Sequence, residues 1–360
     1  MKKLNLGIIF GGRSGEHEVS LVSSKSIISH VDAKKYNIFK IKITQDGKWF
    51  LEDKKSIPVL INLAPEKGKL ILADKSGKSL CDLDVVFPVL HGPFGEDGTI
   101  QGLFEMANVP YVGCGVMASS VAMDKITTKK LLDKAGVPNS KYMWFTREYF
   151  AKNSAAVMKN IIHEIRIPCF VKPSRMGSSV GISKVKHERD LEKAIKLACE
   201  YDSRILVEKH INGHEIECAV LGNSNPKAST VGEIILGGEF YDFYDKYVNG
   251  KSRGEIPAKI SPRLSEEFQL MCLKTYRTLD CAGMARVDGF LSKDDNALYI
   301  NEINTIPGFT SISMYPKMWA HAGIPYEKLI EDLIALAFDA HKEKNKNKVN
   351  FSSKSDWFKK

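Results

Sequence analysis

The sequence predicts an α/β protein of two or three packed domains. At 360 residues it is longer than one hydrophobic core usually organises, and 43% of its residues are hydrophobic, so a sizeable core is available. In the N-terminal third, short apolar runs that suit strands alternate with helical spacings. A second pattern, two strand-like runs that carry acidic side chains, lies near residue 300.

The N-terminal region is expected to open with a strand, a turn and a helix. Residues 4–10 form an apolar run that Gly11-Gly12 ends, and apolar residues recur at helical spacing over 21–31. Apolar residues alternate with lysines over 39–43, which predicts a half-buried strand. A further apolar run at 85–90 precedes a glycine-rich turn and another helix.

The middle of the chain is expected to be a small α+β unit. A helix is predicted from Asp124 to Ala135, because Gly136 can cap its C-terminus and Pro138 cannot continue it. We place the first domain boundary just before this helix. The other predicted elements are a strand at 169–171, a Gly/Ser loop, a helix at 191–198 and a strand at 205–207.

The C-terminal region is expected to carry a helix and a hairpin. A long polar and aromatic loop is predicted from about Glu233, and a helix around 266–278. The strand-like runs 283–291 and 298–304 flank the turn residues Asp294-Asp295-Asn296.

This hairpin is the most specific chemical signal in the sequence. A turn centred on Asp295 places Asp288 opposite Glu302, and the period-two rule puts Asn304 on the face of Glu302. Facing like charges are destabilising unless something neutralises them. Two carboxylates and an amide oxygen suit magnesium. Arg286 shares the face of Asp288, so a salt-bridge ladder explains the hairpin equally well. The Pro/Gly/Ser loop that follows favours the cation site, because it offers backbone N–H groups to an anion.

A lysine at the end of a predicted strand precedes the Gly/Ser loop. Lys172 can contact a phosphate while the amides of residues 174–181 wrap over it. The G-K-[ST] ending of a P-loop is absent, so that fold is not expected.

Further along the chain, Glu208 and Glu215 can accept hydrogen bonds from an adenine amino group and ribose hydroxyls. Taken alone, a Gly/Ser turn or a surface acid is more often structural.

Two polar loops follow the first and the later apolar runs of the N-terminal region. Residues 11–18 do not meet the dinucleotide pattern G-x-G-x-x-G, but their position suits a ligand loop at the carboxyl edge of a sheet. Glu16 can hold an ammonium group there, and His91 is expected near the same edge. A lone histidine at a strand end is still more often structural.

Composition and charge restrict the class of protein only loosely. The net charge of +9 suits nucleotides, nucleic acid or an acidic surface alike, and part of it lies in a polar tail over 342–360. Seven scattered cysteines without a C-x-x-C pair indicate reduced, mostly buried thiols. The apolar run at the N-terminus is too short for a signal peptide or a membrane span, so a cytoplasmic protein is expected.

Taken in order, these motifs resemble the ATP-grasp superfamily, and from Gly11 to about Pro325 the chain resembles the D-alanine–D-alanine ligase family within it. The resemblance implies a three-domain ATP-grasp fold, α/β overall and α+β in the ATP-binding part, with a parallel-sheet preATP-grasp domain first. The implied regions are 1–122, 123–220 and 221–345, followed by a polar tail at 346–360. The strings that carry the resemblance are GGRSGEHEVS (11–20), HGPFGEDGT (91–99), KPSRMGSSVG (172–181) and NEINTIPGFT (301–310).

The resemblance implies ATP-dependent ligation of two D-alanines through a D-alanyl phosphate, for peptidoglycan precursors. It implies two Mg²⁺ (or Mn²⁺) ions, leaves activation by K⁺ open, and implies a homodimer without nucleic-acid or membrane partners. One alternative is a related ligase with D-lactate or D-serine as acceptor. A second is a non-catalytic nucleotide or nucleic-acid binder that exploits the positive charge, which leaves the paired acids unexplained.

The family's site roles carry over onto matching positions of this sequence. Those for ATP and metal are Lys125 and Lys172 on the phosphates, Glu208, Lys209, Ile211 and Glu215 around adenosine, and Asp288, Glu302 and Asn304 on the metals. Those for the amino acids are Glu16 on the first ammonium, His91 near the first carboxylate, Arg286 and the Gly308 N–H as oxyanion hole, and Ser313 and the Met314 N–H on the second carboxylate.

The stretch 240–247 resembles the family's mobile lid, which closes over the site and excludes water. Within it, Lys246 is expected to bind substrate, and Tyr247 matches a tyrosine that bonds to the equivalents of Glu16 and Ser178, which favours an amine acceptor. Two positions depart from the commoner pattern. They are His210, where many relatives have an aromatic residue near adenine, and Ile306, where a small polar residue is frequent.

Overall fold

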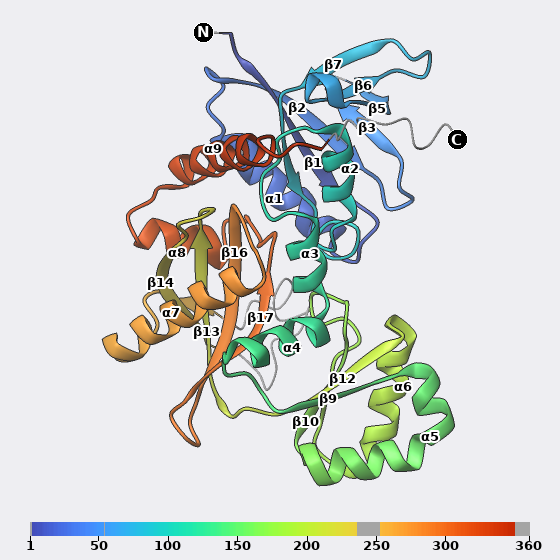
Figure 1. Ribbon diagram of the computed structural model, residues 1–360, viewed down its shortest axis with the longest axis vertical. Helices are drawn as coiled ribbons and strands as arrows, with labels where there is room; N and C mark the ends of the chain where they lie inside the picture. Colours follow the sequence, from blue (N-terminus) through green and yellow to red (C-terminus); the bar gives the residue numbers. More distant parts are fainter. Residues whose placement is uncertain (1, 54, 236–252, 350–360) are drawn as a thin grey trace, which may run out of the picture.

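The computed structural model describes residues 2–53, 55–235 and 253–349, and these residues form four β-sheets with helices around them. Figure 1 shows an elongated molecule with one sheet region at each end of the long axis and a third between them. The predicted α/β class is confirmed.

The N-terminal sheet has the strand order β4-β3-β2-β1-β8, and β1 runs parallel to both of its neighbours. A small antiparallel sheet, β5-β6-β7, packs beside it. Three of these strands were predicted, whereas the short strands between residues 49 and 83 were not. The strands are β1 (Leu4–Gly11), β2 (Tyr36–Ile43), β3 (Trp49–Glu52), β4 (Ser56–Pro58), β5 (Leu60–Ala64), β6 (Lys69–Ala73), β7 (Ser79–Leu83) and β8 (Val85–Val89).

The middle region contains an antiparallel sheet of order β11-β10-β12-β9, which confirms the predicted α+β unit. Its own buried cluster packs α5 and α6 against the sheet. The strands are β9 (Tyr142–Thr146), β10 (Cys169–Pro173), β11 (Ser183–Val185) and β12 (Arg204–Lys209).

The C-terminal region contains an antiparallel sheet of order β15-β14-β13-β16-β17, and the predicted hairpin is its β16–β17 edge. The strands are β13 (Gly213–Leu221), β14 (Lys227–Ile235), β15 (Arg253–Glu255), β16 (Met284–Ser292) and β17 (Leu298–Asn304). Residues 233–235, where the long loop was expected to begin, are strand, because β14 extends to Ile235. The lid stretch 240–247 lies outside the described residues.

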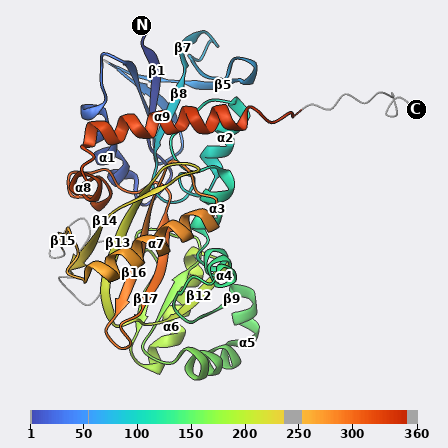
Figure 2. The same ribbon diagram turned by 60° about the vertical axis from the view of Figure 1, so that its left-hand side comes forward.

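The last long helix, α9, returns to the N-terminal sheet and packs on it together with α1 (Figure 2). Its buried face is apolar at helical spacing, at Leu329, Ile330, Leu333, Ile334 and Ala337. The same buried cluster includes residues of β13 and α8, so one core joins the N-terminal and C-terminal sheets.

The helices connect the three regions. Helices α3 and α4 run from the N-terminal sheet to the middle one (Figure 1). Helix α4 ends at Gly136 in the left-handed conformation, as predicted from the sequence. No helix among the described residues is long and apolar enough to cross a membrane. The helices are α1 (His17–His30), α2 (Thr99–Ala107), α3 (Val116–Met123), α4 (Lys125–Ala135), α5 (Arg147–Asn160), α6 (Leu191–Tyr201), α7 (Pro262–Thr278), α8 (Met314–His321) and α9 (Tyr326–Lys344).

Candidate active site

The β16–β17 hairpin pairs Asp288 with Glu302, as predicted, and also pairs Arg286 with Asn304. The hairpin is not the regular ladder that was expected. Near the turn Gly289 pairs with Ile300, and the next pair is Asp288 with Glu302, so Asn301 is an extra residue in a β-bulge.

The bulge decides which side chains face the core. Ile300 and Ile303 are both buried in the apolar cluster under the sheet, although they are three residues apart. In a regular strand such residues point to opposite faces. Because of the bulge, Asn301 and Glu302 both point away from this core and line the same cavity. The spacing of Leu298, Ile300 and Ile303 is the sequence signal that could have revealed it.

The acid pair is part of a row of three carboxylates. Glu217 on β13 pairs with Asp288, and Asp288 pairs with Glu302, so one acid from each of three neighbouring strands shares a row of the sheet. Two of them, Glu217 and Asp288, are buried. The sequence analysis missed Glu217 because its pairing with β16 is long-range.

Arg286 lies among these acids and binds them directly. Its Nε and Nη2 donate to the two carboxylate oxygens of Asp288 at 2.7 Å each, and Nε lies 3.3 Å from Glu217 Oε2. Although burial disfavours its charge, the Asp288 and Glu217 carboxylates raise the pKa of Arg286 well above its ordinary value. Glu302 instead pairs with Lys125, at 3.3 Å. Asp288 therefore forms the salt bridge with Arg286 that the alternative interpretation of the hairpin expected. Arg286 also lines a cavity.

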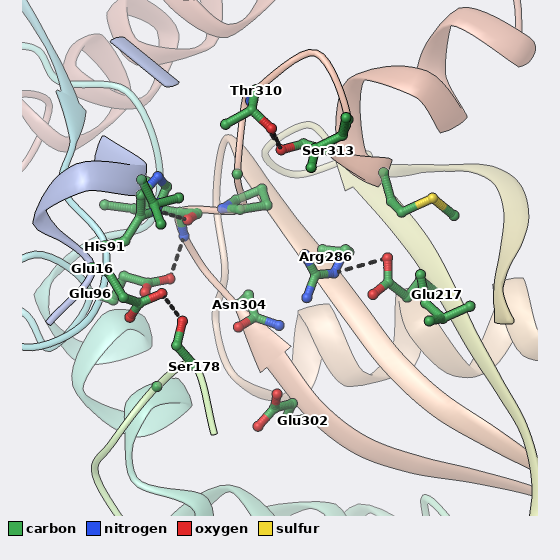
Figure 3. A pocket seen from close by; sticks show the side chains of 18 residues that line it. Glu16, His91, Glu96, Ser178, Glu217, Arg286, Glu302, Asn304, Thr310 and Ser313 are labelled. Atoms are coloured by element: carbon green, nitrogen blue, oxygen red, sulfur yellow. Dashed lines mark hydrogen bonds and ion pairs between the residues drawn. The ribbon is translucent and has the colours of Figure 1, made fainter. Parts of the chain in front are cut away.

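That cavity has a volume of about 120 Å³ and lies between α1, the Gly/Ser loop, the hairpin and the loop before α8 (Figure 3). It brings together most of the residues predicted to bind the amino acids. They are Glu16, His91, Ser178, Arg286, Gly308, Ser313 and Met314, and the cavity is also lined by Glu302 and Asn304, which were predicted for the metals.

The Gly/Ser loop reaches across to the start of α1. The Ser178 hydroxyl donates to Glu16 Oε1, which confirms that these two predicted residues meet (Figure 3). A Cβ on Gly177 would lie 2.7 Å from Glu16 Oε2, so a larger residue there would displace the Glu16 carboxylate. Tyr247 and Lys246, which were expected beside them, lie outside the described residues.

His91 is buried and bonds to protein through both ring nitrogens. Nδ1 lies 3.0 Å from the Ile306 carbonyl oxygen and Nε2 lies 3.2 Å from Ser23 Oγ. Burial lowers the pKa of His91, so the ring is neutral at neutral pH. Beside it lies Glu96, which the sequence analysis did not single out although it belongs to the same motif. Burial, with the nearby charge of Glu16, raises the pKa of Glu96 to about 8.

At the other end of the cavity, Ser313 precedes α8. Its hydroxyl accepts a hydrogen bond from the Thr310 N–H at 3.0 Å and lies 2.8 Å from the Thr310 hydroxyl (Figure 3). Met314 is the first residue of α8. Backbone N–H groups at a helix N-terminus favour an anion, so this end suits a carboxylate.

A second cavity, of about 240 Å³, lies between β10, β12 and the hairpin. It is lined by all six residues predicted for ATP, namely Lys125, Lys172, Glu208, Lys209, Ile211 and Glu215. Phe170 and His210 also line it, with ring centroids 5.6 Å apart. Many relatives have an aromatic residue at the position of His210, and the imidazole ring of His210 likewise lines the cavity here.

Glu208 is engaged with two lysines. Its carboxylate lies 2.6 Å from Lys172 Nζ and 2.5 Å from Lys129 Nζ, and it accepts a hydrogen bond from the Ser140 hydroxyl at 2.8 Å. Burial disfavours its charge, but the two lysines still hold the pKa of Glu208 far below its ordinary value. Glu208 therefore positions Lys172 as well as lining the cavity. Lys129 was missed because a helical lysine is normally exposed.

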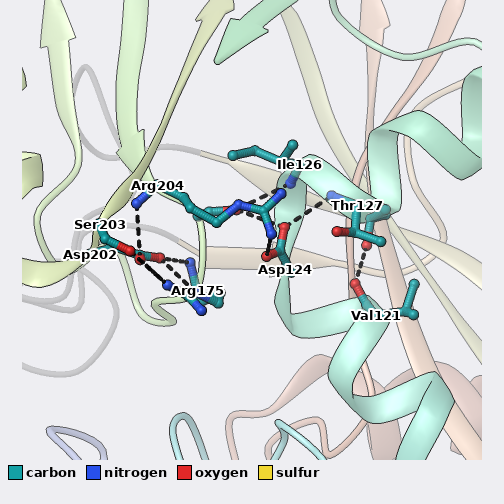
Figure 4. Close-up of polar contacts among 10 residues, drawn as sticks. Val121, Asp124, Ile126, Thr127, Arg175, Asp202, Ser203 and Arg204 are labelled. Atoms are coloured by element: carbon teal, nitrogen blue, oxygen red, sulfur yellow. Dashed lines mark hydrogen bonds and ion pairs between the residues drawn. The ribbon is translucent and has the colours of Figure 1, made fainter. Parts of the chain in front are cut away.

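Polar contacts at the start of α4 position Lys125 (Figure 4). Asp124 caps the helix by accepting from the Thr127 N–H, and its other oxygen lies 2.8 Å from Arg204 Nη1. The backbone N–H of Lys125 donates to the Ser174 carbonyl, and its Nζ donates to the Met176 carbonyl at 2.9 Å. The N-terminus of α4 is therefore joined to the base of the Gly/Ser loop.

The same loop base is held by a second acid. Asp202 accepts hydrogen bonds from the backbone N–H of Arg175 and of Arg204, and pairs with the Arg175 guanidinium (Figure 4). Its side chain is nearly buried. The two arginines therefore link the start of β12 to the loop and to α4.

No group of three or more His, Cys, Asp or Glu side chains among the described residues is arranged to hold a metal. The predicted metal residues are two acids and an amide. The Asn304 amide donates to Asp288 Oδ2 at 2.9 Å, so it is already ordered beside the acid pair. Carboxylate and amide oxygens close to Lys125, one of the two lysines predicted for phosphate, are a donor set that fits Mg²⁺.

Two family models match the chain. One, described as D-ala D-ala ligase N-terminus, matches residues 5–114, and the other, D-ala D-ala ligase C-terminus, matches residues 131–335. Together they include every residue that lines the two cavities except Lys125.

Full-length relatives and solved structures point to the same family as the two family models. The chain is 45% identical to a D-alanine–D-alanine ligase of Thermoanaerobacter sp. (strain X514), over 96% of this chain and 99% of that protein. It is 44% identical to one of Natranaerobius thermophilus, over 98% and 100%. The D-alanine–D-alanine ligase structure from Coxiella burnetii superposes with a TM-score of 0.84 at 37% identity, covering 96% and 97%. The VanG D-Ala:D-Ser ligase from Enterococcus faecalis superposes at 0.83 and 36% identity, covering 93% and 100%.

Proposed function

The chain belongs to the D-alanine–D-alanine ligase family, and we propose that its two cavities act together to join two D-alanines, using ATP, through a D-alanyl phosphate. It is an ATP-dependent, ADP-forming carbon–nitrogen ligase of the ATP-grasp fold. The dipeptide D-alanyl-D-alanine is the product expected for peptidoglycan precursor synthesis.

The observation that carries this proposal is the wall between the two cavities. Gly177, Ser178 and Glu302 line both of them. A nucleotide in the larger cavity would therefore present its terminal phosphate to an amino acid in the smaller one. Phosphoryl transfer depends on the placement of the two reactants more than on covalent chemistry from the protein.

In the first step the carboxylate of one D-alanine attacks the γ-phosphorus, an O–P bond forms, and the bond to the ADP oxygen breaks. Glu16, held by Ser178, would bind the ammonium of this D-alanine. Lys125 and Lys172 would neutralise the phosphate oxygens as charge shifts to ADP.

In the second step the amine of another D-alanine attacks the acyl carbon and a C–N bond forms. The C–O bond to phosphate then breaks, and the proton of the amine passes to the departing phosphate or to solvent. Arg286 and the Gly308 N–H would stabilise the oxyanion that forms on the former carboxylate oxygen. Ser313 and the Met314 N–H would hold the second carboxylate at the N-terminus of α8. His91, Lys246 and Tyr247 complete the proposed substrate residues, and the roles of Lys246 and Tyr247 rest on the family resemblance.

We assign the cation site to Asp288, Glu302 and Asn304. Mg²⁺ or Mn²⁺, when bound there, would neutralise the phosphate charge that faces the acid row. A bound cation would also relieve the repulsion among the carboxylates, together with Arg286 and Lys125. Glu208, Lys209, Ile211 and Glu215 would surround adenosine. Two further expectations are a homodimer, which rests on the family alone, and a cytoplasmic location. The regions 1–122, 123–220 and 221–345 are our proposed domains.

The deciding experiment is an acceptor assay. The protein is incubated with ATP, Mg²⁺ and D-alanine, phosphate release is followed, and the product is identified by mass. We expect release with D-alanine alone, and D-alanyl-D-alanine as product. Release only after D-lactate or D-serine is added would assign one of those acceptors instead, and no release with any of them would refute the proposal. Omitting Mg²⁺ and titrating Mn²⁺ or K⁺ identifies the ions required.

A further inference from the structure

The loop that carries Gly308 is tied to the protein on both sides of that glycine. Before it, the Ile306 N–H donates to Glu96 Oε1 at 3.1 Å, and the Ile306 carbonyl lies 3.0 Å from His91 Nδ1. After it, the Phe309 N–H donates to Ser23 Oγ at 3.3 Å, and the Phe309 carbonyl accepts from the Tyr326 hydroxyl at 2.8 Å. Three of these four partners, Glu96, His91 and Ser23, come from the N-terminal region.

The hydrogen bonds have one consistent direction. A carbonyl only accepts, so His91 Nδ1 carries the hydrogen. In the neutral ring Nε2 is then an acceptor, and it takes the hydroxyl hydrogen of Ser23, 3.2 Å away. Ser23 in turn accepts from Phe309. The two peptide groups that flank Pro307-Gly308 are thus joined through His91 and Ser23.

These bonds leave one backbone donor for the cavity. Of residues 306–310, Ile306, Phe309 and Thr310 donate to Glu96, Ser23 and Ser313, and proline has no N–H. Gly308 lines the cavity, and its N–H has no partner among the residues that the structure describes. A Cβ at Gly308 would lie 2.7 Å from Ser313 Oγ, so the loop is also closely packed there.

We propose that Glu96, His91 and Ser23 are positioning residues that hold the Gly308 N–H towards the reacting carboxyl group. This inference rests on the proposed function, because it requires an oxyanion in the cavity. A donor that is already oriented needs no rearrangement when charge develops on the substrate. It therefore stabilises the transition state more than a mobile donor does. His91 then acts through the loop and need not touch the substrate.

The sharpest test compares two neighbouring buried serines of α1. Ser23→Ala removes the link between His91 and Phe309. Ser24→Ala is the matched control, because the Ser24 hydroxyl donates to the Leu21 carbonyl within the helix. We expect Ser23→Ala to lower kcat by about 10-fold to 100-fold, the usual effect of a supporting hydrogen bond, without changing the KM for ATP. We expect Ser24→Ala to match the unmodified protein.

Two histidine variants separate positioning from simple loss of packing. In His91→Asn the side-chain amide can still donate to the Ile306 carbonyl, whereas His91→Leu keeps the volume and loses the donor. We expect His91→Asn to retain more kcat than His91→Leu at equal thermal stability. Equal kcat in the two variants would contradict the proposal.

Hydrogen–deuterium exchange of the peptide 305–313 tests the bonds independently of turnover. We expect faster exchange in Ser23→Ala and Glu96→Gln than in Ser24→Ala. Unchanged exchange in both would refute the inference even if the ligase reaction is confirmed. Faster exchange with unchanged kcat would refute the role of Gly308. If the unmodified protein released no phosphate with any acceptor, the proposed function would fail, and with it the catalytic part of this inference, while exchange would still decide whether these residues hold the loop.

Discussion

Asp288 and Glu302 lie directly opposite each other on β16 and β17, one residue beyond a bulge at Asn301. Their repulsion is offset from two different directions, because Arg286 binds Asp288 and Lys125 binds Glu302. The pair therefore lies where the row of acids on the hairpin meets the larger cavity, which Glu302 lines.

The first prediction concerns this pair. Asp288→Asn and Glu302→Gln should each lower D-alanine-dependent phosphate release by at least about 100-fold, because each removes a proposed metal ligand. The measurement is initial rate at saturating Mg²⁺, with folding checked by thermal denaturation. Asp294→Asn, in the exposed turn of the same hairpin, should keep the full rate. Full activity in both site variants would overturn the metal assignment.

The second prediction concerns the bulge residue. Asn301→Ala should raise the KM for ATP by roughly 3-fold to 10-fold, because Lys172 Nζ donates to Asn301 Oδ1 at 3.4 Å in the nucleotide cleft. The KM for D-alanine, measured in the same assay, should stay constant and serves as the internal control. A change in that constant alone would place Asn301 at the amino-acid cavity instead.

The third prediction concerns the buried lysine of α4. Lys129→Met should lower the free energy of unfolding by about 3 kcal/mol, because it breaks a buried ion pair with Glu208 and leaves that carboxylate with one lysine fewer. Urea denaturation at neutral pH measures this. Lys130→Met, next to it and exposed over the Trp144 ring, should cost no more than about 1 kcal/mol. Equal losses would show that Lys129 matters only through helix propensity.

The fourth prediction concerns pH. The folded-state pKa of Glu208 lies below the ordinary value of 4.5, since the two lysines outweigh burial. The unfolded chain therefore binds this proton more readily, and the stabilisation is complete above pH 4.5 and lost as the pH falls below it. Glu208→Gln should flatten the stability profile in that acidic range. An unchanged slope would mean that other carboxyl groups dominate acid unfolding.

The fifth prediction concerns the base of the Gly/Ser loop. Arg204→Met should raise the KM for ATP by roughly 3-fold to 10-fold, because Asp124 loses a charged partner and holds the N-terminus of α4, and with it Lys125, less firmly. Arg189→Met, exposed in the same region, is the matched control and should leave the constant unchanged. A rise in the control as well would indicate a general effect of charge.

Local patterns alone predicted the elements that carry the chemistry. The alternation of the two hairpin strands, with turn residues between them, predicted Asp288 opposite Glu302, although it is the unpredicted bulge at Asn301 that brings this pair into register. The glycine and proline after α4 were enough to end that helix. These features depend on residues that are neighbours in the sequence, so residue propensities and the spacing of apolar residues are enough to predict them.

Only the tertiary structure decided the rest, because it brings together residues that are far apart in the sequence. Glu217 joins the acid row through pairing with β16, Lys129 is buried because Glu208 and Ser140 surround it, and Glu96 is a site residue only because Ile306 packs on it. The resemblance pointed to Ser178, whereas the role of Glu16 was already indicated by its position after the first strand. The sequence by itself thus determined the fold class, the hairpin and the order of the motifs, and long-range packing determined which buried charges hold the catalytic groups in place.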